Sequence, residues 1–196
     1  YAESQIYQIM KHQGKHYLAT EAGLFGIDVN TGALHAYSSD LGGTIPTNNV
    51  HSIFAESEKL WLSTADAGLM QWNVKSDTVA TYGRANGLPS EVVYGILEDD
   101  KNYLWISTDN GLSRYNPKTS VFKNYGIGDG LPEFEFNRTS FHKGPSGNLY
   151  FGTIDGFIKF DPTHFQEDSL RNNVPLQIVS LSQDVSDSSK VIDVYS

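Results

Sequence analysis

A unit of about 44 residues repeats four times along this 196-residue chain. Threonines recur at spacings of 44, 44 and 45 residues, at Thr20, Thr64, Thr108 and Thr153. Prolines recur every 43 residues, at Pro46, Pro89, Pro132 and Pro175. Unrelated hairpins would not hold both sets of landmarks in phase, so the chain is built from copies of one structural unit.

The third unit shows what each copy contains. Four short runs rich in β-branched and aromatic residues alternate with turn signals; the runs are VVYGILE, YLWIST, LSRY and VFKNY. Asp109-Asn110-Gly111 includes the Asn-Gly dipeptide that favours a tight primed hairpin turn, and Asn116-Pro117 marks the next turn. An antiparallel four-stranded sheet of this length is one blade of a β-propeller.

The predicted fold is therefore all-β, with residues 1–175 forming a partial β-propeller of four four-stranded antiparallel units of about 43–45 residues. The predicted blades are 4–46, 47–89, 90–132 and 133–175. Trp61, Trp105 and Tyr150 occupy one equivalent place in the second run of their units. They are predicted to form the core between blades, and a stacking platform for a sugar is the alternative.

The end of the chain departs from the repeat. Residues 163–173 are polar and contain no clear fourth strand, so we expect the native N-terminal part of the chain to supply that strand and close the propeller by a shared blade. Two strand-like runs follow within residues 176–196, and together they are too short for a domain. They are predicted to be the first strands of a truncated β-sandwich domain.

Composition narrows the classes of function. The net charge of -9 and the absence of a basic stripe exclude a nucleic-acid partner on electrostatic grounds. The chain has no cysteine, and its six histidines do not have metal-ligand spacing. No serine elbow or matched nucleophile and base is present. The sequence therefore predicts no catalytic residue, no cofactor and no metal site.

The third unit, GLPSEVVYGILEDDKNYLWISTDNGLSRYNPKTSVFKNY, resembles the two-component regulator propeller repeat that builds the sensor region of hybrid two-component system proteins. The later stretch GDGLPEFEFNRTSFHKGPSGNLYFGTIDGFIKFDP looks like the final blade of that family. LQIVSLSQD lies where the family's small sandwich domain, called Y_Y_Y, begins. The resemblance covers residues 4–185.

This resemblance implies a periplasmic sensor region of an inner-membrane protein. The chain would be a fragment of the ligand-sensing propeller of a hybrid two-component sensor histidine kinase, with the kinase in the parent protein and no enzyme activity in the fragment. The implied partners are an oligosaccharide or similar ligand, and the remaining propeller and sandwich domain of the parent chain. We also expect self-association through exposed blade faces. A propeller lyase or hydrolase and a structural dimerisation module are the alternatives.

Propeller geometry also indicates where a ligand would bind. Inter-blade loops and the turns between second and third strands emerge on one face, where polar side chains can converge on the central funnel. The candidate ligand-binding residues are Arg84, Asn86, Glu91, Asp109, Asn137 and Arg138. Arginine and asparagine supply the directional donors that hydroxyl- or carboxylate-bearing ligands need. The alternative for each residue is a hydrogen bond that stabilises a loop or joins two blades.

Overall fold

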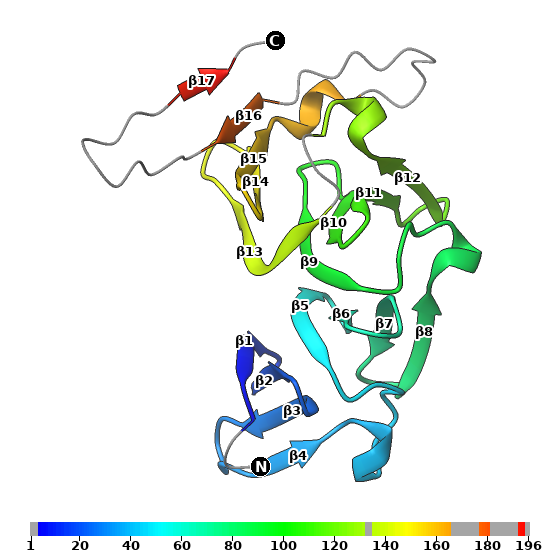
Figure 1. Cartoon of the computed structure of the whole chain (residues 1–196). Helices are drawn as coiled ribbons and strands as arrows, with labels where there is room; N and C mark the ends of the chain where they lie inside the picture. The colour runs from blue at the N-terminus through cyan, green and yellow to red at the C-terminus, as the bar shows by residue number, and fades with distance from the viewer. Residues whose placement is uncertain (1–3, 132–134, 166–176, 181–191, 195–196) are drawn as a thin grey trace.

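Four antiparallel sheets follow one another along the chain and fan out around a common axis (Figure 1). The structure is a computed structural model that describes residues 4–131, 135–165, 177–180 and 192–194. The first sheet contains β1 Ile6–His12, β2 Lys15–Thr20, β3 Gly23–Asp28 and β4 Leu34–Ala36. The second contains β5 Val50–Glu56, β6 Lys59–Thr64, β7 Leu69–Asn73 and β8 Thr78–Tyr82.

The third sheet contains β9 Val93–Glu98, β10 Leu104–Thr108, β11 Gly111–Asn116 and β12 Val121–Tyr125. The fourth contains β13 Phe136–Lys143, β14 Leu149–Thr153, β15 Gly156–Phe160, β16 Gln177–Ser180 and β17 Ile192–Val194. Within the sheets each strand pairs with the next along the chain. The predicted all-β fold of propeller blades is thus confirmed.

Short 3-10 helices occupy the loops. Three lie between blades, at η1 Ser39–Leu41, η2 Arg84–Asn86 and η3 Ile127–Asp129, and η4 Pro162–His164 follows β15. Among the described residues, no helix has the length and apolar character needed to cross a membrane.

The fourth sheet corrects one expectation. The sequence suggested that this blade lacks its outer strand, yet β16 pairs with β15, with Ile178 opposite Ile158. The strand comes from the stretch assigned to a sandwich domain, because a β-branched run such as QIVS can pair with any free sheet edge. Residues 166–176 lie outside the described residues, and the domain boundary after residue 175 stays a prediction.

The hairpin between β10 and β11 also differs from its prediction. Thr108 pairs with Gly111, so the two loop residues are Asp109 and Asn110, and neither has a positive φ. Gly111 has φ +96° instead, and a Cβ there would lie 2.5 Å from the Tyr125 carbonyl oxygen. The Thr108 hydroxyl donates to the Gly111 carbonyl and accepts from the Asn110 N–H. The glycine is therefore required by close packing after the turn and not by a primed turn.

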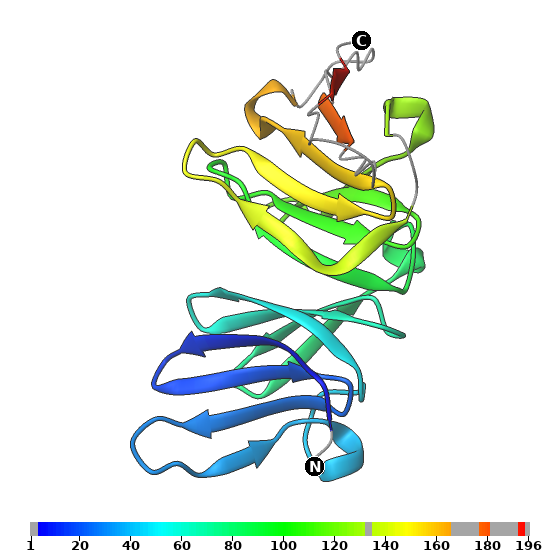
Figure 2. The same ribbon diagram turned by 60° about the vertical axis from the view of Figure 1, so that its left-hand side comes forward.

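The core lies between neighbouring sheets, which Figure 2 shows one after another along the fan. Trp61 and Trp105 are fully buried, as predicted for the inter-blade core, whereas the equivalent Tyr150 is only half-buried. Trp61 packs among residues of the third blade, and Trp105 packs among residues of the fourth. Burying a large aromatic side chain contributes a few kcal/mol, so these contacts set how the blades stack.

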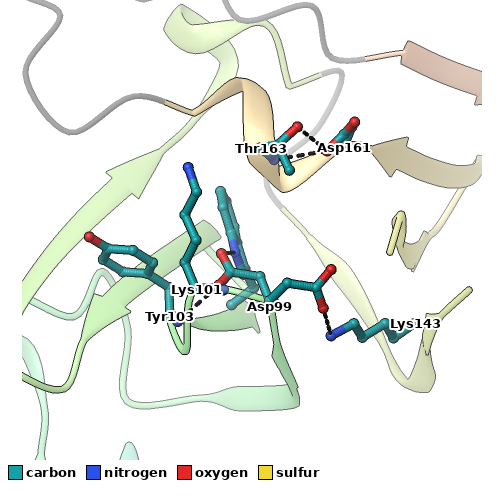
Figure 3. A network of polar contacts seen from close by, with 8 residues as sticks. Asp99, Lys101, Tyr103, Lys143, Asp161 and Thr163 are labelled. Atoms are coloured by element: carbon teal, nitrogen blue, oxygen red, sulfur yellow. Dashed lines mark hydrogen bonds and ion pairs between the residues drawn. The ribbon is translucent and has the colours of Figure 1, made fainter. Parts of the chain in front are cut away.

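A buried carboxylate fixes the turn between β9 and β10 (Figure 3). Asp99, 4% exposed, accepts hydrogen bonds from the backbone N–H groups of Lys101 (2.9 Å) and Tyr103 (3.0 Å). Its second oxygen accepts from Nε1 of Trp105 at 2.9 Å. The turn and the central aromatic residue of the blade are thus held by one side chain.

We expect Asp99→Asn to lower the free energy of unfolding by about 1–3 kcal/mol, because an amide nitrogen would face a buried N–H donor. Urea denaturation measures the change. The matched control is Asp100→Asn, which removes a 2.7 Å ion pair between the exposed Asp100 carboxylate and the partly buried Lys143, and should cost at most about 1 kcal/mol. Equal losses in the two variants would show that the buried network does not stabilise the turn.

Candidate ligand site at the propeller axis

The first strand of each sheet (β1, β5, β9 and β13) contains a β-bulge near its beginning, and these four strands are the innermost ones. Ile6, Val50, Val93 and Phe136 pair with the four repeat threonines, and in every case the register shifts directly afterwards. The residues in the bulges are Tyr7, His51, Tyr94 and the stretch 137–140. Bulges re-aim side chains and are over-represented at functional sites. Because β1, β5, β9 and β13 lie nearest the axis (Figure 1), the bulges gather side chains from all four blades.

His51 lies at the centre of this group and is 2% exposed. The centroid of its ring is 5.6 Å from that of Tyr7 and also 5.6 Å from that of Tyr94. Its Nδ1 lies 2.7 Å from the Val93 carbonyl oxygen. A carbonyl can only accept, so Nδ1 carries the proton and the neutral ring has its lone pair on Nε2. Burial lowers the pKa of His51, and the charge of Arg138 lowers it further.

Arg138 closes the group from the fourth blade. Its Nη1 donates to the Tyr7 hydroxyl at 3.2 Å, and its guanidinium lies 5.5 Å from the centroid of the Tyr7 ring. The arginine is nevertheless exposed. It therefore links the first and fourth blades at the axis and keeps donors available to solvent or to a ligand. We call Tyr7, His51, Tyr94 and Arg138 the axial cluster.

Carboxylates lie within electrostatic range of the axial cluster. Burial raises the pKa of Tyr94, and the negative charges of Glu135 and Asp109 raise it further, so these groups lie within electrostatic range of the ring. Oδ1 of Asp109 is buried and accepts no hydrogen bond from the described residues. A buried oxygen of this kind costs free energy until a donor reaches it. The axial cluster thus offers aromatic rings and a cationic donor, and Asp109, within electrostatic range of Tyr94, has a buried oxygen without a donor from the described residues.

Two of the sequence-predicted residues, Asp109 and Arg138, belong to this region. Asn137 lies beside Arg138 in the fourth bulge and donates its side-chain N–H to the Thr153 carbonyl. That bond spans β13 and β14 within one blade. Asn137 thus has a structural role next to the axial cluster.

The other three predicted residues, Arg84, Asn86 and Glu91, organise the loop between β8 and β9. Asn86 accepts from the Gly83 N–H at 2.9 Å, and Glu91 accepts from the Arg84 backbone N–H at 3.0 Å. The Arg84 side chain is exposed. The Glu91 carbonyl also accepts from the Gly68 N–H at 2.8 Å, which holds this loop to a turn of the second blade. The structure does not bring these three residues into the axial cluster.

Sequence reasoning missed Tyr7, His51 and Tyr94. A signal for two of them was present, since His51 and Tyr94 each stand five residues after a repeat proline, and Asn137 stands at the same offset from Pro132. The offset alone could not show a bulge, because an unbulged strand would point the same residue into a blade face. Within the described part of the chain, no group of three or more acidic or histidine side chains is arranged to hold a metal ion.

Comparison with known proteins supports the repeat and the fold. Residues 87–110 match the family described as two component regulator propeller. The third blade therefore carries a two-component regulator propeller repeat, as its sequence indicated. No curated protein sequence matches the chain.

Solved structures share the architecture. The extracellular domain of the putative one component system BT4673 from B. thetaiotaomicron is 17% identical over 96% of this chain and 29% of its own, with a TM-score of 0.69. The extracellular domain of the putative hybrid two component system BT3049 from the same organism is 19% identical, with 97% of this chain and 32% of that domain covered and a TM-score of 0.60. Virginiamycin B lyase from Staphylococcus aureus is 17% identical, with 82% of this chain and 54% of the lyase covered, and its TM-score is also 0.60. At these identities the likeness shows the fold, and the chain spans less than a third of both B. thetaiotaomicron domains.

The electrostatic link between Arg138 and His51 gives a prediction. We expect the imidazole of His51 to titrate below 6.5, and Arg138→Gln to raise its pKa because a nearby positive charge disfavours the imidazolium. NMR titration of the histidine Cε1–H signals measures both. Because the pKa of His51 is lower in the folded chain than in the unfolded chain, the unfolded chain binds the imidazolium proton more tightly. The contribution of His51 to stability is therefore complete above about pH 6.5, and it falls as the pH drops through and below that value.

Arg84→Gln is the matched control, because it removes an exposed arginine outside the axial cluster. The His51 signal should titrate unchanged in this variant. A shift as large as that of Arg138→Gln would mean that overall charge, and not the axial contact, sets the pKa of His51.

Proposed function

We propose that this chain is part of the extracytoplasmic ligand-sensing propeller of a hybrid two-component sensor histidine kinase. In this proposal the propeller lies in the periplasm, the parent protein is anchored in the inner membrane, and the kinase belongs to another part of the parent. The fragment itself performs no catalysis. The repeat at residues 87–110 and the likeness to extracellular domains of two-component systems support this assignment.

The observation that carries a sensing function is the axial cluster. One side chain from each of four blades meets there, so a ligand bound at the axis contacts the whole fan at once. A ligand shifts a conformational equilibrium only by its difference in affinity for the two states. Contacts shared among blades provide that difference, because any change in blade packing moves the bulges relative to one another.

We further propose that the ligand is an oligosaccharide. Sugars present rows of hydroxyl groups that both donate and accept, and apolar ring faces that stack on aromatic side chains. Arg138 offers donors, and the buried Oδ1 of Asp109 offers an acceptor. The rings of Tyr7 and Tyr94 each have their centroid 5.6 Å from that of His51. This combination suits a polyhydroxylated ligand better than a purely anionic or apolar one.

Calorimetric titration of this chain, and of the whole sensor region, with a panel of neutral and acidic oligosaccharides tests the proposal. We expect Arg138→Ala and Tyr94→Ala each to weaken binding by about tenfold or more, since a directed hydrogen bond or an aromatic stack contributes roughly 1–2 kcal/mol. Circular dichroism confirms that the variants remain folded.

Arg84→Ala is the matched control and should bind as the unmodified chain does. Loss of affinity in Arg84→Ala, with Arg138→Ala unaffected, would move the site to the loop between β8 and β9. No binding by the chain or by the whole region across the panel would leave the structural dimerisation module as the better assignment. Product formation from any oligosaccharide would favour the lyase or hydrolase alternative.

A further inference from the structure

The imidazole of His51 presents a hydrogen-bond acceptor at the axis. The ring is 2% exposed, and its Nδ1 carries the proton that the Val93 carbonyl oxygen accepts at 2.7 Å. Its Nε2 therefore holds a lone pair, for which the described residues supply no donor. Polar atoms of buried side chains are normally paired, so a donor from a ligand would stabilise this nitrogen.

Asp109, in the turn between β10 and β11, supplies a second acceptor. Its Oδ1 is buried and accepts no hydrogen bond from the described residues. The corresponding turn of the second blade differs, because the Asp66 carboxylate there accepts from the Thr47 hydroxyl at 2.7 Å. Of these two turn carboxylates, Asp109 is the one that an incoming donor would stabilise more.

The ring of Tyr94 lies close to both acceptors. Its centroid is 5.6 Å from that of His51. Burial raises the pKa of Tyr94, and the charges of Glu135 and Asp109 raise it further, so both carboxylates act on this ring. The Arg138 guanidinium lies over the ring of Tyr7, whereas no lysine or arginine of the described residues lies over the half-buried ring of Tyr94. The Tyr94 ring is thus available to a cation from a ligand.

The electrostatic field at the axis is negative. The charged groups that act on His51 and Tyr94 are three carboxylates and one cation, namely Asp66, Asp109, Glu135 and Arg138. The whole chain carries a net charge of -9. Such a field attracts a cationic ligand and repels an anionic one. An ammonium group also matches the unpaired acceptors, because it has three donors and no acceptor.

We propose that the axial cluster selects an amine-bearing saccharide, whose ammonium group lies against the ring of Tyr94 and donates to the Asp109 carboxylate. A neighbouring hydroxyl or N–H group of the sugar donates to Nε2 of His51. This inference rests on the proposed ligand-sensing function and names the class of oligosaccharide. A uronic acid would bring a further anion without a donor toward these carboxylates. A neutral sugar donates through its hydroxyl groups but gains nothing from the negative field.

Four trimers with the same β-1,4-linked glucose backbone test the proposal. They carry an amine, an N-acetyl group or a hydroxyl at C2, or a carboxylate at C6. Calorimetric titration of this chain and of the whole sensor region at about pH 6.5, where an amine of ordinary pKa is protonated, measures each affinity. We expect the glucosamine trimer to bind at least about fivefold more tightly than either neutral trimer, and the glucuronic acid trimer to bind most weakly. High salt should reduce the preference for the amine.

Variants that change the charge at the axis give the sharper test. Asp109→Asn should remove most of the preference for the amine. Arg138→Gln should weaken the binding of every trimer and widen the preference, because it makes the field more negative. Glu58→Gln is the matched control, since it removes one negative charge from a pair with Lys75 in the turn between β5 and β6, away from the axial cluster. Circular dichroism checks that each variant is folded.

Tight binding of the glucuronic acid trimer, equal to that of the glucosamine trimer, would overturn the inference and leave the sensing function in place. An equal loss of preference in Glu58→Gln and Asp109→Asn would also overturn it, because overall charge would then explain the selection. The inference fails and the sensing function stands if none of the four trimers binds but another oligosaccharide of the wider panel does. If no oligosaccharide binds, both fail.

Discussion

The contact between the second strand of one blade and the third strand of the next is the interaction on which the rest of the structure depends. A four-stranded sheet of short strands is too small to be stable alone, so each blade needs a neighbour on at least one face. Trp61 and Trp105 supply that contact at full burial, and Tyr17 supplies it for the first pair. The indole N–H groups of the two tryptophans are not left unpaired by burial. Glu56 accepts the hydrogen bond from Trp61, and Asp99 accepts the one from Trp105.

Face-to-face stacking of the sheets determines what happens at the axis. It brings the four innermost strands together, and the bulge in each strand then aims a side chain toward the centre. The result is a small polar region beside a largely apolar core. His51 remains neutral because it is buried, and Asp109 keeps an oxygen without a donor from the described residues. A ligand, an ordered water or another segment can complete a group of this kind.

The same stacking explains why the two ends of the fan differ from its middle. At each of the three junctions, an aromatic side chain from the second strand of one blade contacts an aromatic side chain from the third strand of the next blade. Among the described residues, the second and third blades each contribute to two hydrophobic clusters, whereas the first and the fourth each contribute to one. Ile9 in the first blade is exposed, and Tyr150 in the fourth blade is only half-buried.

The sequence by itself determined the number and type of blades, because strand periodicity and turn residues act over a few neighbouring positions. The buried positions of Trp61 and Trp105 and the end of β12 at Tyr125 were predictable in this way. Tertiary structure alone decided that Tyr7, His51, Tyr94 and Arg138 meet, since they are at least 43 residues apart and each depends on a bulge. It also separated Arg138 from Arg84, although both looked equivalent in sequence. Loop residues point toward the axis only where the stacking of whole sheets places them, and a local pattern does not contain that information.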